Sequence, residues 1–215
     1  RFTGMLSIHN ASQIQLFGLR LSDNQIYDDM FHCVYCNDVQ ILNSVFEGAK
    51  SDAIDIDISK KMHLKNLFIQ GAGNDSIDLM TSEAAIVDTT LVGAGDKGLS
   101  VGEASLAFLV NSRLLNNAVG VESKDGSVVY AFNADFLHNN VHLSAYSKNW
   151  RYGAGGNIDI RKSLISGGTQ LKQISDGSRL YMFDNGLEKP LYEKQSNQTS
   201  DVSAADLEYT IEEQE

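Results

Sequence analysis

The sequence repeats a pattern of short alternating apolar runs every 22 or 23 residues. The apolar residue that opens each run falls at Phe31, Ile54, Ile77, Leu99, Val121 and Leu143, and Leu6 fits one repeat earlier. A second apolar position recurs later in the repeat, at Leu21, Phe46, Ile69, Leu91, Leu114, Phe136 and Leu164. In five of these repeats an Asn or Asp stands three residues before it, at Asn43, Asn66, Asp88, Asn111 and Asn133. Regular spacing at two separate positions indicates a solenoid.

Each repeat is built from strands rather than helices. Alternation with a period of two is typical of strands with one buried face, and no run before residue 190 shows a long 3.6-residue apolar stripe. A repeat of this length cannot bury its apolar face alone, so successive coils must stack about 4.8 Å apart. The sequence therefore predicts an all-β fold, a parallel β-helix of about eight coils.

The chain divides into two parts by composition. Residues 1–187 carry the repeats and are expected to form the β-helix domain. Residues 188–215 contain eight acidic residues and two lysines, which predicts an acidic tail or a capping segment, with 203–214 as a candidate short helix. The interval from Phe136 to Leu164 is 28 residues, so the segment 147–156 is an insertion that must project from the stack.

The overall charge argues against several kinds of partner. The chain has 17 basic and 28 acidic residues, a net charge of −11, whereas nucleic acids and anionic membrane surfaces are bound by basic residues. Apolar runs of about 18 residues, the length that a membrane span requires, do not occur in the sequence. We therefore predict no nucleic-acid partner and no membrane partner.

Two cysteines, Cys33 and Cys36, stand in a C-x-x-C spacing. One pair does not make a disulfide framework, and no second pair accompanies it. We interpret both as free cysteines packed in the core, with a weak metal or redox site as the alternative.

The repeats resemble those of the pectate-lyase-like superfamily of right-handed parallel β-helices over roughly residues 4–186. The resemblance rests on segments such as Ile54-Asp55-Ile56, Asn43-Ser44-Val45-Phe46 and Asn133-Ala134-Asp135-Phe136. That superfamily includes polysaccharide lyases, glycoside hydrolases, sugar epimerases, phage tailspikes and non-catalytic surface proteins, so the fold alone does not name a function. Its lyases resemble one another in a calcium site of stacked aspartates with a Lys or Arg base.

Outward positions of the coils gather acidic side chains. With Ile54 and Ile77 pointing inward, their neighbours point outward and stack in columns. Five carboxylates then lie close together on two adjacent coils, and the repulsion between them favours a bound cation. Ca²⁺ is the ion that such oxygen ligands suit best. The predicted metal ligands are Asp52, Asp55, Asp57, Asp75 and Asp78. The run 74–78 also resembles the paired-aspartate pattern of calcium-dependent pectate lyases, with Asn74 and Ser76 in place of an Asp and a Gly.

The resemblance implies β-elimination on an acidic polysaccharide. Lys97 and Lys124, on the next coils, are the candidate bases, and Glu103 and His32 are candidate acids or subsite residues. Aromatic and charged residues around the insertion could contact sugar rings and uronate carboxylates. The predicted substrate-binding residues are Glu122, Tyr146, Trp150, Arg151 and Tyr152.

A non-catalytic reading of the same residues stays open. Outward positions of a solenoid must be polar, so the columns could form a solvated surface or a structural Ca²⁺ site of a sugar-binding or surface module. We expect a secreted or cell-surface protein with further coils or domains outside this chain. A trimeric fibre is a third option, but it requires exposed apolar outer positions, and these columns are acidic.

Overall fold

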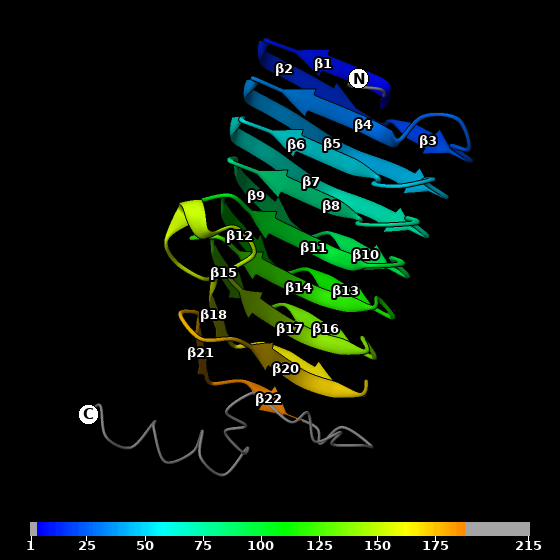
Figure 1. Cartoon of the computed structure of the whole chain (residues 1–215). Helices are drawn as coiled ribbons and strands as arrows, with labels where there is room; N and C mark the ends of the chain where they lie inside the picture. Colours follow the sequence, from blue (N-terminus) through cyan, green and yellow to red (C-terminus); the bar gives the residue numbers. More distant parts are fainter. Residues whose placement is uncertain (1–3, 188–215) are drawn as a thin grey trace.

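Eight parallel strands form the first of two sheets, which faces the viewer in Figure 1. The computed structural model describes residues 4–187. In stacking order, the strands of this first sheet are β1 (Gly4–His9), β4 (Asp29–Val34), β6 (Ile54–Asp57), β8 (Ile77–Met80), β11 (Lys97–Gly102), β14 (Val119–Lys124), β17 (Val141–Tyr146) and β20 (Gln170–Ile174).

The second sheet has 14 strands and two limbs, joined where the long strands β5 (Asn37–Glu47) and β7 (Lys60–Gln70) run through both. The first limb continues with β2 (Ser12–Phe17), β9 (Glu83–Val87), β12 (Leu106–Val110), β15 (Val128–Phe132), β18 (Asn157–Arg161) and β21 (Arg179–Phe183). The second limb adds β3 (Arg20–Ser22), β10 (Thr90–Val92), β13 (Arg113–Leu115), β16 (Asp135–Leu137), β19 (Leu164–Ser166) and β22 (Gly186–Leu187). Each coil therefore contributes one stretch to the first sheet and two to the second, which is the architecture of a parallel β-helix.

The strand register confirms the predicted repeat. Phe31, Ile54, Ile77, Leu99, Val121 and Leu143 are successive partners in the first sheet, and all are fully buried. The second apolar position is also confirmed as far as Phe136. The last assignment is wrong by one residue, because Phe136 pairs with Ile165 and Leu164 points outward. The insertion before this coil hides the spacing that fixed the other six positions.

Asparagine and aspartate recur in the repeat because they turn a corner of each coil. Asn43, Asn66, Asp88, Asn111 and Asn133 all have φ between 50° and 54°, a left-handed conformation that Asn and Asp tolerate better than other non-glycine residues. Their side chains also bond between coils, since the Asn66 amide donates to Asn43 Oδ1 at 2.7 Å. At another corner, Gly95 allows close approach, because a Cβ there would lie 2.3 Å from the Gly73 carbonyl oxygen.

The two cysteines are not free, contrary to the expectation. Cys33 and Cys36 form a disulfide across the corner between β4 and β5. Strand alternation places Cys33 inside the coil, and Tyr35, with φ of 55°, turns the chain so that Cys36 also faces the interior. Both sulfur atoms are therefore buried and meet inside the stack.

The predicted insertion leaves the stack after β17 and projects beside it (Figure 1). It contains η1 (Trp150–Tyr152), a 3-10 helix capped by the Asn149 side chain, which accepts the Arg151 N–H. Within residues 4–187, no helix has the length and apolar character needed to cross a membrane. The predicted tail or cap at 188–215 lies outside the described residues.

Candidate active site

The outward side of the first sheet carries three parallel columns of side chains, which together we call the polar face. The first column, near the strand starts, holds Asp29, Asp52, Asp75 and Lys97. The central column holds His32, Asp55, Asp78, Ser100, Glu122 and Ser144. The third column, near the strand ends, holds Val34, Asp57, Met80 and Gly102, and further along it Lys124 and Tyr146 pair with each other. The predicted columns are thus present.

These columns are far less solvated than an outer surface would suggest. His32 is 1% exposed, Glu122 5% and Lys124 6%. Strands about 4.8 Å apart place each side chain against its neighbours in the coils before and after it. Burial strengthens every electrostatic interaction on this face, because less water screens it.

The coils of strands β4, β6 and β8 carry the acidic half of the polar face, which holds Asp29, Asp52, Asp55, Asp57, Asp75 and Asp78. His32 lies at the centre of this half. Its Nε2 is 3.5 Å from Asp55 Oδ2 and 3.4 Å from Asp57 Oδ2. One ligand atom from each of the three residues lies within 4.8 Å of the other two. Burial, followed by the negative charges of Asp57 and Asp29, raises the pKa of Asp55 to about 9. The three residues are therefore arranged to share a proton or a cation.

Two more carboxylates of this half are tied to the coil that follows each of them. Asp52 Oδ1 accepts hydrogen bonds from the Asn74 amide and the Asp75 N–H, both at 2.8 Å. Asp75 Oδ1 accepts the Lys97 N–H at 2.9 Å. Burial nevertheless raises the pKa of Asp75 to about 7, and burial also raises the pKa of Asp52. Each of these aspartates therefore has one oxygen engaged within the protein.

Asp29 extends the acidic half by one coil. Burial and the neighbouring charge of Asp52 raise the pKa of Asp29 to about 6. Asp78, the fifth predicted ligand, pairs in register with Asp55, and its negative charge raises the pKa values of Asp55 and Asp75. The pKa values of these aspartates are raised because their negative charges lie close together in a buried environment, where little water solvates them.

A second cluster, centred on Glu122, forms the lysine half of the polar face. Glu122 Oε1 accepts the Tyr146 hydroxyl at 3.1 Å and lies 3.7 Å from Lys124 Nζ and 3.9 Å from Lys97 Nζ. Lys124 Nζ also donates to Ser100 Oγ at 2.9 Å. Burial and the charge of Glu122 raise the pKa of Tyr146 to about 12. The structure thus brings together four of the predicted catalytic and substrate-binding residues.

Lys97 links the two halves. Its Nζ lies 3.6 Å from Asp75 Oδ1, and it also donates to Asp96. Burial disfavours its ammonium form, but the hydrogen bond to Asp96 and the charges of Asp75 and Glu122 outweigh burial and raise the pKa of Lys97. Lys97 therefore points at the aspartates, as predicted, but it is an ammonium in these surroundings.

The other three predicted substrate-binding residues lie on the projecting loop. Trp150 is 83% exposed, and the Arg151 guanidinium lies 5.9 Å from the centre of its ring. Buried Asp125 holds this loop, since its Oδ1 accepts the N–H groups of Lys148 and Asn149 at 2.6 and 2.7 Å. The loop thus starts from an anchored point directly after Tyr146, and Trp150, Arg151 and Tyr152 are available to solvent beside the polar face.

Sequence reasoning missed two features of the site. It treated His32 only as an acid or subsite residue, although its position one coil before Asp55 already placed it in the same column. It gave Asp125 no role, because nothing in the repeat marks this residue as the anchor of a loop 23 residues later.

Comparisons with known proteins identify the fold. No protein-family model matches the sequence, and no curated protein matches it either. Among solved structures, the chain is similar to the periplasmic alginate epimerase AlgG, with a TM-score of 0.56 and 12% identity over 80% of this chain and 51% of that one. It is also similar to the pectate lyase pelN from Paenibacillus sp. 0602, with a TM-score of 0.55 and 10% identity over 83% of this chain and 63% of that one.

The structural class is therefore a parallel β-helix, the fold that the chain shares with these two proteins. The chain corresponds to about half of the epimerase and less than two thirds of the lyase. Identities of 10–12% establish a common fold, whereas function depends on the particular residues placed on it.

Proposed function

We propose that this chain acts on an acidic polysaccharide by calcium-assisted β-elimination at the polar face. The observation that carries the proposal is the placement of Lys97 directly beside a buried group of aspartates on one exposed sheet. The fold neighbours named above, an alginate epimerase and a pectate lyase, act on polymers of this chemical class.

The acidic half has the chemistry of a divalent-cation site. Carboxylates whose pKa values are raised to about 6, 7 and 9 hold protons more tightly than ordinary aspartates do, and a divalent cation competes for the same oxygens. Asp55 and Asp57 would hold the ion, with Asp78 nearby in the central column and with Asp52 and Asp75 through the oxygens not already engaged. Bound Ca²⁺ would supply positive charge that neutralises the uronate carboxylate and acidifies the proton on the adjacent carbon.

The residues of the chain then have separate tasks. Lys97, once unprotonated, would take the proton from the carbon beside the carboxylate, while the bond from the neighbouring carbon to the leaving sugar oxygen breaks and a carbon–carbon double bond forms. Cationic charge added beside Asp75 favours the neutral amine of Lys97, opposing the aspartates that now raise its pKa. Glu122 and Tyr146 would orient the sugar, and Lys124 is the reserve base. The projecting loop would contact neighbouring sugar rings through Trp150 and Tyr152.

One observation favours a second candidate, a non-catalytic sugar-binding module. Lys97 is held as an ammonium by Asp96, Asp75 and Glu122, and in that state it can pair with a uronate carboxylate but cannot remove a proton. The same face would then bind an acidic polymer without cleaving it. We expect either form to belong to a secreted, periplasmic or cell-surface protein, because its polymeric substrate lies outside the cytoplasm.

The test is a screen of polygalacturonate, alginate and glycosaminoglycans, with Ca²⁺ or with EDTA, following the ultraviolet absorbance of unsaturated uronate ends. We expect absorbance to rise on one uronate polymer with Ca²⁺ and to stay flat with EDTA. Asp55→Asn should lose the Ca²⁺ response, whereas Asp176→Asn, an exposed carboxylate in the last described coils, should keep it. No unsaturated product and no change of uronate composition on any polymer would reject catalysis and leave the binding module. A changed uronate composition without unsaturated ends would indicate epimerisation, which begins with the same proton removal.

A further inference from the structure

The first limb of the second sheet exposes a run of aromatic side chains. Two outward columns follow the coils there: Phe108, Tyr130, Asp159 and Tyr181 in one, and Val110, Phe132, Arg161 and Phe183 in the other. The five aromatic residues in these columns are between 39% and 56% exposed. We call these eight residues the aromatic strip; it runs along β12, β15, β18 and β21 (Figure 1).

This group of exposed aromatic residues differs from the scattered apolar residues found on most protein surfaces. Single exposed apolar residues are common and need no explanation, but contiguous apolar patches on a protein surface usually mark a binding site. Here exposed rings stand in register on β12, β15 and β21, with Asp159 and Arg161 between them on β18, so the strip is linear and parallel to the solenoid axis. A linear site suits a linear ligand.

Two of the five rings stand on edge. Phe108 and Tyr130 are stacked on each other across adjacent strands, with ring centres 5.6 Å apart and planes 18° from parallel. Because their faces meet each other along the axis, their edges face solvent. The edge of an aromatic ring carries the positive part of its quadrupole, so this surface presents positive edges and a phenolic hydroxyl to an oxygen-rich ligand.

Charges on and beside the strip are nearly balanced, unlike those of the acidic half of the polar face. Arg161 donates two hydrogen bonds to Asp159, at 2.8 and 2.7 Å, and Lys162 Nζ lies 5.7 Å from the centre of the Phe132 ring. Arg179 begins β21. Lys162 and Arg179 thus accompany the paired Arg161 and Asp159, with the exposed Asp184 one coil after Lys162, in a chain whose net charge is −11. A polyanion repelled by the acidic half of the polar face can approach here.

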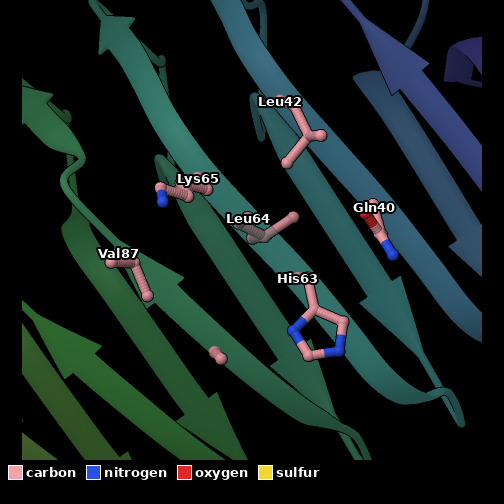
Figure 2. A pocket seen from close by; sticks show the side chains of 7 residues that line it. Gln40, Leu42, His63, Leu64, Lys65 and Val87 are labelled. Atoms are coloured by element: carbon pink, nitrogen blue, oxygen red, sulfur yellow. The ribbon is translucent and has the colours of Figure 1, made fainter.

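A hollow continues the strip toward the N-terminal coils. It has a volume of about 240 Å³ and is lined by Gln40, Leu42, His63, Lys65, Ala85 and Val87, with Leu64 behind them (Figure 2). It forms because Ala85, the strand partner of Phe108, is too small to continue the aromatic column. His63 adds a hydrogen-bonding group and Lys65 an exposed ammonium, whose Nζ lies 4.0 Å from Asp88 Oδ2. The hollow and the strip therefore make one track of polar and aromatic side chains.

We propose that this track binds an acidic polysaccharide chain, separately from the polar face. The strip favours a linear polyanion over a second copy of the chain because its exposed cations, Arg161, Lys162 and Arg179, can exchange weak surface partners for the carboxylates of a polymer. A second copy would bring the same cations. The inference goes beyond the proposed function, since binding on the second sheet requires neither Ca²⁺ nor Lys97. The track would hold the polymer while the polar face acts on the same or another strand of it.

Affinity electrophoresis tests the proposal, in native gels that contain EDTA and polygalacturonate, alginate or neutral dextran. The proteins are the wild type, the double variant Tyr130→Ser/Phe132→Ser, Arg161→Gln, and Tyr27→Ser as a control for an exposed aromatic outside the track. A Lys97→Ala protein separates this binding from catalysis. Melting temperatures verify that each variant is folded.

We expect the acidic polymers to retard the wild type, Tyr27→Ser and Lys97→Ala equally. The double variant should lose at least tenfold in affinity, and Arg161→Gln should lose severalfold. Unchanged binding by the double variant, or equal retardation by dextran, would overturn the proposal. A wild-type dimer in light scattering that the double variant converts to a monomer would also overturn it, because the strip would then be a contact between copies.

Discussion

The polar face and the aromatic strip are built on the same coils, yet they carry opposite chemistry. Both consist of outward positions of short parallel strands, and both repeat in register from coil to coil. The polar face gathers carboxylates until their pKa values rise, whereas the strip gathers aromatic rings with arginines. Fold stability depends on inward residues that the two surfaces share, so each outward surface is free to acquire its own ligand.

The largest effect should come from breaking what the two surfaces share. Leu99 is fully buried between Ile77 and Val121, and Leu99→Asp would place an uncompensated charge between coils. We expect this variant to be unfolded at room temperature by circular dichroism. Phe108→Asp, at an outward position of the second sheet, should fold. A Leu99→Asp protein that melts like the wild type would contradict the assigned register.

Removing the candidate base should separate the polar face from the strip in activity. Lys97→Ala should lower turnover of the acidic polymer by about 100-fold or more, the usual range for a general base. Lys65→Ala, in the hollow of the second sheet, should keep the turnover rate constant, since it does not contact the reacting sugar. Steady-state kinetics on both variants decides this, and near-normal turnover by Lys97→Ala would shift the role of base to Lys124.

The charge of Asp55 should destabilise the protein when no cation is present. At pH 9 in EDTA, Asp55→Asn should raise the melting temperature by several degrees, because the variant removes a buried carboxylate that ionises at a cost. The same substitution should remove stabilisation by millimolar Ca²⁺. Thermal melts of this variant beside Asp176→Asn make the comparison. Equal melting of both variants under both conditions would count against a cation site.

Stability should also depend on pH in a definite direction. Asp29, Asp75 and Asp55 have folded pKa values of about 6, 7 and 9, above the ordinary aspartate value near 4. The folded state therefore binds protons more tightly than the unfolded state, so their contribution is present below about pH 4 and is lost as the pH rises through 6 to 9. Melting temperatures in EDTA should fall across this window, and Ca²⁺ should flatten the fall. A melting temperature that does not change with pH in EDTA would show that folding does not raise the pKa values of these carboxylates.

The smallest effect on stability is expected on the strip. Tyr130→Ser/Phe132→Ser should change the free energy of unfolding by only about 1 kcal/mol, because both rings are nearly half exposed. Urea denaturation measures this difference. A loss of several kcal/mol would show that the rings serve the fold rather than a ligand.

The coils were predictable from the sequence because inward residues obey a fixed spacing. The buried ladder from Phe31 to Leu143 follows from that spacing alone, and the same arithmetic relates Phe108 to Tyr130 on the second sheet. The aromatic strip was nevertheless missed, since only the acidic columns of the first sheet were followed outward. Those columns were also the basis for disfavouring exposed apolar positions, which the second sheet does carry.

Other properties depend on distances that a repeat does not contain. Alternation does not reveal that Cys33 and Cys36 meet at a corner. It also does not give the exact length of the insertion, which places Ile165 rather than Leu164 at the inward position. It places Lys97 beside Asp75, but the raised pKa of Lys97 depends on where Asp96 and Glu122 direct their oxygens. The composition of the site was predictable, whereas its protonation was not.

Calorimetric titration of Ca²⁺ into the wild type and Asp55→Asn at pH 8 tests the central claim, that the acidic half of the polar face holds a divalent cation. Titrations with Mn²⁺ and Zn²⁺ would show whether His32 takes part, because imidazole favours transition metals over calcium. The account predicts saturable binding of one ion by each wild-type chain and its loss in Asp55→Asn. No binding of any of the three ions, or identical binding by the two proteins, would contradict it.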